Sequence, residues 1–578
     1  MKRKILATAL MLICCLLVLA GCKGGNSDLM TLAKDKSTDF KVVSYCENAD
    51  KVKGFVADLV IKTSTKFQRV EESAAGDHAI YVGTDKQMKG KGGTSAKMNT
   101  ATCYEILIHD GNIYVCAGSE DIIDTVLEKL MEHLVKIEKG LYGIEKELEI
   151  RADFCPITET IPMFQSATAT ASELHDCGND NYLTIYSYLN ISDTQREIDT
   201  YAATLKSKGF TLVQENDIVG NQFALYSKGD AMVHYSYFPA KREFRMVYGS
   251  NKYILPNPTP ITDYEKRVTP CVINPEMSEN EECVILQLAD GSFIVIDGGW
   301  GTSGPQTKTL NAGAHNERVV NYKRDVETDM ARVYTLMKER TPDGGKPQVI
   351  WMITHADPDH ITMPTRFFKD YKDKFDLNMI IANFPNLFNI GLGTGTSDND
   401  PVTMTEYANN FLSAARTYFP GVTEYVYHTG EKLYLPGCEC EFLITPGEDL
   451  WPGVMNWMNH TSGTWRFTIE GKTVMIPGDA ESSLCNLMVG LYGSYLKSDI
   501  LQPNHHGANG ATRGFYACID PSICIWQCQQ YHLDYDNRQC GVANGYDFNK
   551  FLRTSKNVKA HLSTSYTSVI SLPSLEIQ

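Results

Sequence analysis

The most constraining feature of the sequence is an apolar segment, Gln348–Ile353, that continues directly into Thr-His-Ala-Asp-Pro-Asp-His at residues 354–360. A short apolar stretch of this kind predicts a buried β-strand, and we expect the residues after it in a loop stiffened by Pro358. Two histidines and two aspartates so close together are costly to bury unless a cation neutralises them. The alternative is a solvated acidic turn with incidental histidines, which fits poorly with a strand that enters the cluster directly. The sequence therefore predicts a catalytic metal site with the ligands His355, Asp357, Asp359 and His360.

Three further predicted strands have residues of the same type next to them. Asp479 follows one strand, the adjacent pair His505 and His506 follows another, and His460 precedes a third. Each of these histidines alone is more often structural than a ligand, but four such clusters in one chain favour a shared site. Imidazole and carboxylate ligands suit zinc, manganese or iron. The three strands are expected at Arg466–Ile469, at Thr473–Ile476 and within Ile500–Gly507.

The length of 578 residues predicts about three or four domains. Residues 38–155 indicate a small α/β accessory domain, with a helix expected at 120–138 from its apolar spacing. Residues 165–255 indicate a small α+β domain, with a helix at Thr194–Lys208 followed by four antiparallel strands. Neither small domain contains a catalytic constellation. A linker is expected at Pro256, Pro258 and Pro260.

Residues 268–578 form the third predicted domain. Strands alternate with helices there, which is typical of a layered α/β sandwich. A helix is expected at Asp325–Glu339. Besides the strands already named, strands are expected at Val284–Leu288, Phe293–Ile296, Met379–Ala382, Lys432–Leu435 and Cys440–Ile444.

Residues 1–21 have the composition of a secretory signal segment, with a positive start and the apolar stretch Ile5–Leu19, which is short for a membrane span. Leu19-Ala20-Gly21-Cys22 resembles the lipobox of bacterial lipoproteins, which implies cleavage before Cys22 and lipidation of that residue. Residues 22–37 then indicate a flexible tether. We expect a lipid-anchored, extracytoplasmic protein at the cell membrane. The alternatives are an uncleaved anchor helix and plain secretion.

Residues 268 to about 570 resemble a metallo-β-lactamase-fold hydrolase. The closest resemblance is to the extracytoplasmic hydrolase domain of bacterial competence (DNA-uptake) channel proteins. It implies a C-terminal αββα four-layer sandwich preceded by two small α+β domains. The matching segments are I-D-G-G at 296–299, H-P-D-x-D-H at 355–360 with Ala356 for Pro, N-x-x-S at 459–462, G-D at 478–479, and P-H-H-G at 503–507 with one inserted Asn.

The resemblance also implies two divalent metal ions, with zinc as the first candidate and manganese as the second. The residues implied for one ion are His355, Asp357 and His460. Those implied for the other ion are Asp359, His360 and either His505 or His506. Asp479 is implied as a bridge between the ions, while Asp297 orients the site by hydrogen bonding from outside the ligand set. The implied reaction is hydrolysis by a metal-activated water, with Asp359 and Asp479 as catalytic residues.

The sequence departs from that family where substrate contacts are expected. Ile361-Thr362-Met363-Pro364 replaces the usual Gly-Gly, and there is no histidine between His532 and His561. The natural substrate therefore stays open. The resemblance favours a phosphodiester or related ester, either a small molecule or a cell-wall component. The net charge of −16 disfavours nucleic acid, because affinity for phosphates comes from lysine and arginine.

A second reading belongs to another functional class. In that reading the chain is a surface-anchored lipoprotein that binds cell wall or carbohydrate and uses the hydrolase fold only as a scaffold. Bound metal and hydrolytic activity separate the two readings. The sequence leaves the oligomeric state open under either one.

Overall fold

The fold is described from a computed structural model of the chain. The described residues are 29–48, 51–89, 103–153, 161–162, 164, 166, 169–179, 181–188, 194–250, 253, 255–311, 317–386, 401–449, 458–535 and 546–578. They belong to two units, Met1–Pro156 and Ile157–Gln578. The signal segment at 1–21, Cys22 and the first part of the predicted tether lie outside the described residues. Within the described ranges, no helix has the length and apolarity needed to cross a membrane.

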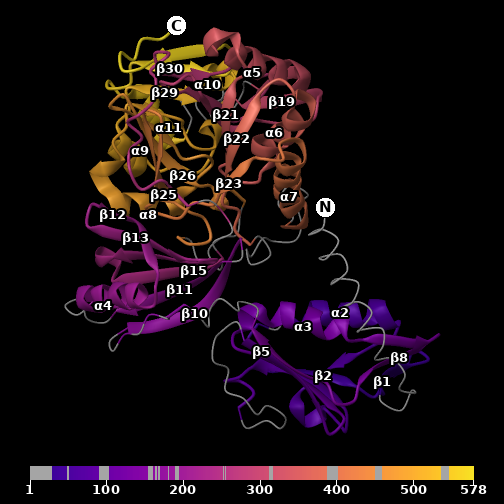
Figure 1. The fold of residues 1–578 in the computed structure, drawn as a ribbon. Coiled ribbons are helices and arrows are strands. Elements are labelled where there is room, and N and C mark those ends of the chain that lie inside the picture. The colour runs from indigo at the N-terminus through magenta and orange to yellow at the C-terminus, as the bar shows by residue number, and fades with distance from the viewer. Residues whose placement is uncertain are drawn as a thin grey trace, which may run out of the picture. The chain divides into compact units, whose positions relative to one another are not determined.

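The first unit contains a six-stranded mixed sheet in the order β3-β2-β4-β6-β5-β9 and a three-stranded sheet in the order β1-β8-β7. Figure 1 labels β2 and β5 of the larger sheet and β1 and β8 of the smaller one. Helices α2 (Lys51–Thr63) and α3 (Ile123–Glu132) bury their apolar faces in one core with the larger sheet. The strands are β1 (Leu29–Lys34), β2 (Lys41–Ser44), β3 (Gln68–Arg69), β4 (Ala79–Thr84), β5 (Cys103–His109), β6 (Asn112–Ala117), β7 (Val135–Glu138), β8 (Leu141–Glu145) and β9 (Glu149–Asp153).

Two predictions for this unit need correction. Residues 29–34, assigned above to the tether, form β1 and pair with β8. The helix predicted at 120–138 ends at Glu132, and Val135–Glu138 is a strand instead. Its hairpin partner β8 follows a turn at Gly140, whose φ of +78° suits glycine. Pairing with β8 therefore outweighs the helical spacing of the residues after Glu132.

The second unit begins with a six-stranded antiparallel sheet in the order β10-β11-β15-β14-β13-β12. Helix α4 (Thr194–Ser207) packs on it, and Tyr201 of α4 contacts Phe244 of β15 edge-on. The helix and four strands expected after residue 190 are present, because their apolar alternation and turn residues agree with one another. The strands are β10 (Ala169–Gly178), β11 (Asn181–Tyr188), β12 (Thr211–Ile218), β13 (Asn221–Lys228), β14 (Ala231–Phe238) and β15 (Glu243–Ser250).

Two seven-stranded sheets make up most of residues 268–578, which have a mixed α/β fold. The first sheet has the order β23-β22-β21-β18-β17-β16-β31, and the second has the order β24-β25-β26-β27-β28-β29-β30. The strands of the first are β16 (Cys271–Asn274), β17 (Cys283–Gln287), β18 (Phe293–Asp297), β21 (Gln348–Met352), β22 (Asp376–Ile381), β23 (Thr423–Tyr425) and β31 (Ser568–Ser571). Those of the second are β24 (Lys432–Leu435), β25 (Cys438–Ile444), β26 (Thr464–Ile469), β27 (Lys472–Ile476), β28 (Ile500–Leu501), β29 (Ile523–Trp526) and β30 (Ala560–Ser563).

Each of these sheets is buried on both faces. In β21, Ile350 and Met352 face the second sheet, while Val349 and Trp351 face the helices, because successive strand residues point to opposite sides. The helices on the first sheet are α5 (Val326–Arg340), α6 (Pro358–Tyr371) and α7 (Pro401–Tyr418). Those on the second are α8 (Ser482–Tyr492), α9 (Arg513–Ile519), α10 (Gln530–Tyr535) and α11 (Asp547–Thr554). A separate hairpin joins β19 (Gly304–Asn311) to β20 (Glu317–Arg324).

The small α+β domain is joined to this two-sheet region by a shared core. Ile218, Phe223 and Phe238 of its sheet belong to the same apolar cluster as Leu484 of α8. Polar contacts add to this, including the side-chain amide of Asn216, which donates to the carbonyl of Gly430 at 2.9 Å. Residues 165–255 and 268–578 consequently lie in one unit, although the sequence predicts two domains.

Candidate metal centre

Four strands bring the predicted ligands to one edge of the two sheets. β18 ends at Asp297 and lies parallel to β21, which leads to His355. In the other sheet, β27 leads to Asp479 and lies parallel to β28, which leads to His506. The carboxyl ends of parallel strands lie at the same edge of a sheet, and the connections beyond them carry the functional side chains.

The His-Asp cluster lies at the start of α6, where a loop was expected. Pro358 is the first residue of α6, and Asp357 precedes it with an extended backbone (φ −65°, ψ 145°). Proline suits this position because the first helical N–H groups have no partner within the helix. Asp359 and His360 therefore occupy the first turn. Negative charge there also interacts favourably with the helix dipole.

Asp297 fixes the orientation of His360. Asp297 Oδ2 accepts hydrogen bonds from His360 Nδ1 at 2.9 Å and from the hydroxyl of Thr354 at 2.7 Å. Its Oδ1 accepts the backbone N–H of Thr354 at 2.8 Å. With Nδ1 donating to Asp297, His360 presents the lone pair of Nε2 to the cluster. This is the orienting contact that the resemblance assigns to Asp297.

His355, His360 and Asp479 form a first group, with one ligand atom from each lying within 4.8 Å of the others. His360 Nε2 lies 3.4 Å from Asp479 Oδ2. In the described part of the chain, His355 Nε2, His360 Nε2 and Asp479 Oδ1 are buried and make no hydrogen bond. Buried polar atoms almost always have a partner. These three atoms are therefore suited to a cation.

Asp359, His360 and His506 form a second group of the same kind. His506 Nε2 lies 3.3 Å from Asp359 Oδ2 and 3.6 Å from Asp479 Oδ2. Its other nitrogen, Nδ1, donates to the carbonyl oxygen of Gln527 at 3.0 Å, which directs Nε2 toward the carboxylates. Asp479 therefore lies beside both groups.

The carboxylates of this cluster favour positive charge on the neighbouring imidazoles, as the directions of the pKa shifts indicate. Burial disfavours charged His360, but Asp479 and Asp297 outweigh burial and raise the pKa of His360 well above its usual value. Burial also disfavours charged His506, but Asp479 and Asp359 outweigh burial and raise the pKa of His506 to about 10. Burial favours neutral Asp479, yet His360 and His506 hold its pKa well below the usual range. Protons or metal ions can supply the required charge, and the two compete for the same atoms.

Three predicted ligands lie at the margin of the cluster. Asp357 Oδ2 is 3.3 Å from His355 Nε2. His460 Nε2 is 3.6 Å from Glu481 Oε2, and among the described residues His460 belongs to no group of three ligand atoms within 4.8 Å. His505 Nε2 is 3.8 Å from Asp479 Oδ2, and its Nδ1 donates to a backbone carbonyl at 2.7 Å. Of the adjacent histidines, His506 therefore lies inside the cluster and His505 beside it.

The cluster is buried on one side and open on the other. The side chains of His355 and His360 have no exposed surface, whereas that of Asp359 is 22% exposed and that of Asp357 is 17% exposed. Water and a substrate can therefore reach the carboxylates without disturbing the histidines. This arrangement can bind cations and expose them to a small polar molecule.

Glu282 is a potential ligand that the sequence reasoning missed. It forms a group with Asp479 and His506, and its Oε2 accepts a hydrogen bond from Gln502 at 3.2 Å. Burial raises the pKa of Glu282 well above its usual value. No local sequence signal singled it out, because its place depends on the pairing of Cys283 with Asp297, which sets the residue before β17 next to the end of β18. A glutamate this deeply buried is rare without a partner.

No known family profile matches the chain, and no curated protein matches it. Similar solved structures include CmlA, a diiron beta-hydroxylase from Streptomyces venezuelae, with 12% identity, 55% of each chain covered and a TM-score of 0.30. Another is the metallo-beta-lactamase fold protein YhfI from Bacillus subtilis, with 10% identity, 52% of this chain and 99% of that chain covered, and a TM-score of 0.29. This chain spans about half the length of the hydroxylase. With TM-scores this low, we infer no function from these similarities, and the functional proposal depends on the geometry of the site.

Proposed function

We propose that residues 268–578 form a metallo-β-lactamase-fold, metal-dependent hydrolase that binds two divalent ions. One observation carries the proposal, namely the strand-end cluster, which comprises His355, Asp359, His360, Asp479 and His506. Its ligand-type atoms lie within 4.8 Å of one another in overlapping groups, beyond the ends of strands from both sheets. The two sheets and their outer helices fit the four-layer sandwich that the sequence motifs imply.

In this proposal the histidines and carboxylates have separate roles. His355, His360 and His506 hold the ions through Nε2, with zinc as the first candidate and manganese as the second. Asp479 lies beside both groups and would hold both ions. Asp359 is partly exposed and lies 3.3 Å from His506, so its carboxylate can orient an attacking water. The ions, when bound, would supply a lowered pKa for that water and stabilisation of negative charge on the substrate.

The proposed substrate class is a phosphodiester or related ester. The motifs of residues 296–299 and 355–360 support this class through their resemblance to the competence-channel hydrolase domain. The net charge of −16 favours a small molecule or a cell-wall component over long nucleic acid.

The test combines elemental analysis with a general phosphodiester substrate, bis-p-nitrophenyl phosphate. We expect about two transition-metal ions per chain in the purified protein and measurable hydrolysis. Asp479→Asn should lower kcat/KM roughly a thousandfold, because it removes several kcal/mol of interaction with the ions. Asp373→Asn, which changes an exposed carboxylate after α6, should leave kcat/KM unchanged.

A protein that is metal-free, and that stays inert after zinc or manganese is supplied, would refute the hydrolase. The scaffold reading, in which the chain only binds cell wall or carbohydrate, predicts that result. Equal activity of Asp479→Asn and the wild type would show that hydrolysis, if present, takes place elsewhere.

We also propose that the chain is anchored to the outer face of the cell membrane through a lipid on Cys22. The lipobox-like segment at residues 19–22 supports this proposal. Cys22→Ala should move the protein from the membrane fraction to the soluble fraction and abolish labelling by a radioactive fatty acid. Unchanged membrane association without labelling would instead indicate an uncleaved anchor helix.

A further inference from the structure

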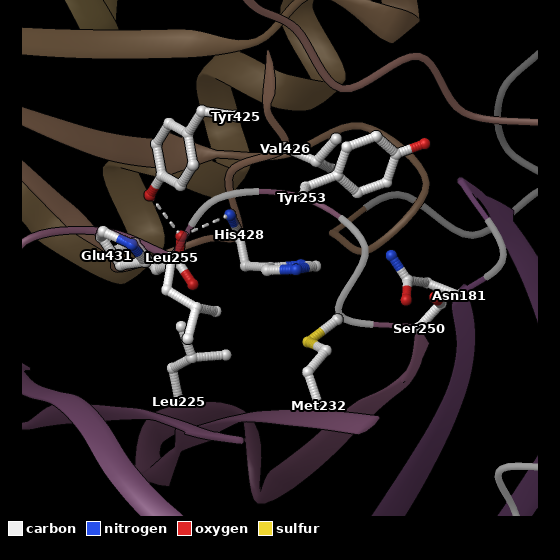
Figure 2. A pocket seen from close by; sticks show the side chains of 11 residues that line it. Asn181, Leu225, Met232, Ser250, Tyr253, Leu255, Tyr425, Val426, His428 and Glu431 are labelled. Atoms are coloured by element: carbon white, nitrogen blue, oxygen red, sulfur yellow. Dashed lines mark hydrogen bonds between the residues drawn. The ribbon is translucent and has the colours of Figure 1, made fainter. Parts of the chain in front are cut away.

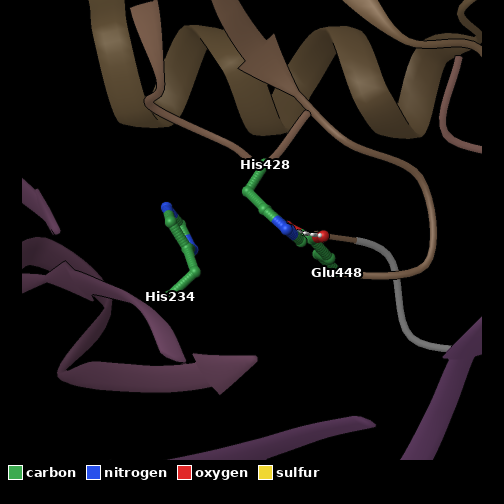
Figure 3. A group of neighbouring side chains, drawn as sticks. All are labelled: His234, His428 and Glu448. Carbon is green, nitrogen blue, oxygen red and sulfur yellow. Dashed lines mark hydrogen bonds and ion pairs between the residues drawn. The ribbon is translucent and has the colours of Figure 1, made fainter. Parts of the chain in front are cut away.

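A second group of potential ligands lies at the contact between the small α+β domain and the two-sheet region. We call His234, His428 and Glu448 the interdomain cluster, and Figure 3 shows the three side chains together. One ligand atom from each lies within 4.8 Å of the others. The rings of His234 and His428 are stacked, with centroids 5.1 Å apart and an interplanar angle of 19°. All three residues are buried, with exposures of 1%, 4% and 4%.

His234 is an unusual residue at its position. It lies in the middle of β14, where every residue is buried, and it pairs with Leu225 and Val247 on the neighbouring strands. The backbone of Thr429 interacts with the ring, yet among the described residues neither ring nitrogen has a hydrogen bond of good geometry. Leaving such a group unsatisfied costs about 1–3 kcal/mol. An apolar residue would avoid that cost, so the imidazole requires another explanation.

The surroundings of the cluster contain more negative than positive charge. Glu448, Asp449 and Glu431 are all buried here. The nearby guanidinium of Arg245 pairs with Asp449, donating from Nη1 to Oδ1 at 2.6 Å. Glu448 instead pairs with His428, whose Nδ1 donates to Glu448 Oε1 at 2.6 Å. Glu431 accepts a hydrogen bond from the backbone N–H of the same histidine. A dication between His234 and the His428–Glu448 pair would release the shared proton to solvent and balance the carboxylates.

Contacts outside the cluster hold His428 in place. The backbone N–H of His428 donates to Glu431 Oε2 at 3.1 Å, and the hydroxyl of Tyr425 donates to the same oxygen at 2.6 Å. Figure 2 shows these bonds beside a pocket lined by His428, Glu431 and residues of the small domain. A ligand held by a supporting shell of this kind satisfies one requirement of a metal site.

We propose that His234, His428 and Glu448 bind one divalent transition-metal ion, with Zn²⁺ as the best fit. Two imidazoles and one carboxylate are a common zinc ligand set, with water as the fourth ligand. The ion would be separate from the strand-end cluster. Because His234 comes from β14 and the other two ligands come from turns of the two-sheet region, the ion joins the two parts of the unit.

The test measures zinc per chain in the full-length protein after dialysis against Zn²⁺ and removal of excess metal. His234→Phe preserves the stacking and approximate volume of the ring, and it should lower the zinc content by about one ion per chain. His175→Phe is the matched control, because His175 is another buried histidine in the same sheet, and it should leave the zinc content unchanged. An unchanged zinc content in His234→Phe would overturn the proposal.

A second variant keeps the test decisive if His234→Phe does not fold. Glu448→Gln retains the side-chain shape and should weaken the same zinc site by at least about tenfold, measured by competition with a chelator. Unaltered affinity in Glu448→Gln would also overturn the proposal. The result is independent of the hydrolase assignment. If the strand-end cluster binds no metal, the wild type still holds one zinc that His234→Phe loses.

Discussion

The strand-end cluster and the interdomain cluster use the same side-chain types in different environments. Both combine buried imidazoles with carboxylates whose ligand atoms lie within 4.8 Å. At the strand ends, Asp359 is 22% exposed, whereas in the interdomain cluster the side chains of His428 and Glu448 are each only 5% exposed. The first cluster can admit a substrate. The second is closed, so an ion there would stabilise the fold.

The backbone that supplies the ligands explains this difference. The strand-end residues lie beyond strands that end at one sheet edge, where the carboxylate of Asp359 stays partly exposed. His234 instead lies inside β14, and the core that includes Phe223 and Phe238 covers its sheet. In the two proposals, the same ligand types would therefore serve catalysis in one place and cohesion in the other, according to solvent access.

The largest expected effect separates the two adjacent histidines of the strand-end cluster. His506→Gln should lower kcat/KM for bis-p-nitrophenyl phosphate roughly a thousandfold, because it removes a metal-facing nitrogen. His505→Gln is the natural control and should change kcat/KM by less than about tenfold, since its side chain lies beside the cluster. Equal losses in the two variants would contradict the placement of His506 inside the cluster.

A smaller effect is expected for the residue that orients His360. Asp297→Asn keeps an oxygen for the N–H of Thr354 but cannot accept from both Thr354 Oγ1 and His360 Nδ1. Metal affinity should fall about 10- to 100-fold, measured by chelator competition. Asp290→Asn, at the other end of the same hairpin, should have no effect on affinity. Unchanged affinity in Asp297→Asn would show that His360 is oriented by its packing alone.

A substitution at the contact between the two parts of the second unit should lower the free energy of unfolding. Gly430 has a φ of +82°, and a Cβ there would lie 2.1 Å from the ring of Phe223. Gly430→Ala should lower the free energy of unfolding by about 1–3 kcal/mol in denaturant titrations. Gly421→Ala places its Cβ in open space and at an ordinary φ, so its stability should stay close to that of the wild type. Similar stabilities for both variants would argue against close packing at this contact.

The smallest effect concerns His561, which belongs to neither cluster. Burial, with a contribution from Arg553, lowers the pKa of His561 from 6.5 to about 4. The unfolded chain therefore binds more protons between these values, and stability falls as the pH drops through this window. At pH 5.5 this penalty is about 1.4 kcal/mol.

His561→Gln keeps an acceptor for the indole N–H of Trp526 and removes the titration. The difference in unfolding free energy between variant and wild type should therefore shift by about 1.4 kcal/mol between pH 7.5 and pH 5.5, in favour of the variant. His109→Gln changes a side chain that is 60% exposed and should show no such shift. A pH-independent difference for His561→Gln would show that this histidine is protonated equally in both states.

Much of the two-sheet region could be predicted because local signals agreed there. The strand expected at Gln348–Ile353 is β21, and the helix expected at Asp325–Glu339 is α5 at Val326–Arg340. Apolar composition, strand length and the polar residues that follow all indicated the same boundaries. The prediction at 120–138 failed because helical spacing and hairpin pairing competed there, and pairing is a tertiary property.

The sequence by itself determined which residues are candidates for the strand-end cluster, because ligand-type side chains follow the ends of apolar strands. Tertiary structure alone decided which of them meet. It placed His506 rather than His505 in a ligand group with Asp479, added Glu282 through the pairing of β17 with β18, and left His460 beside Glu481. The interdomain cluster had no sequence signal, because His234 is about 200 residues from the other two members along the chain. Distances between such residues depend on how sheets and turns pack, and no local periodicity encodes that packing.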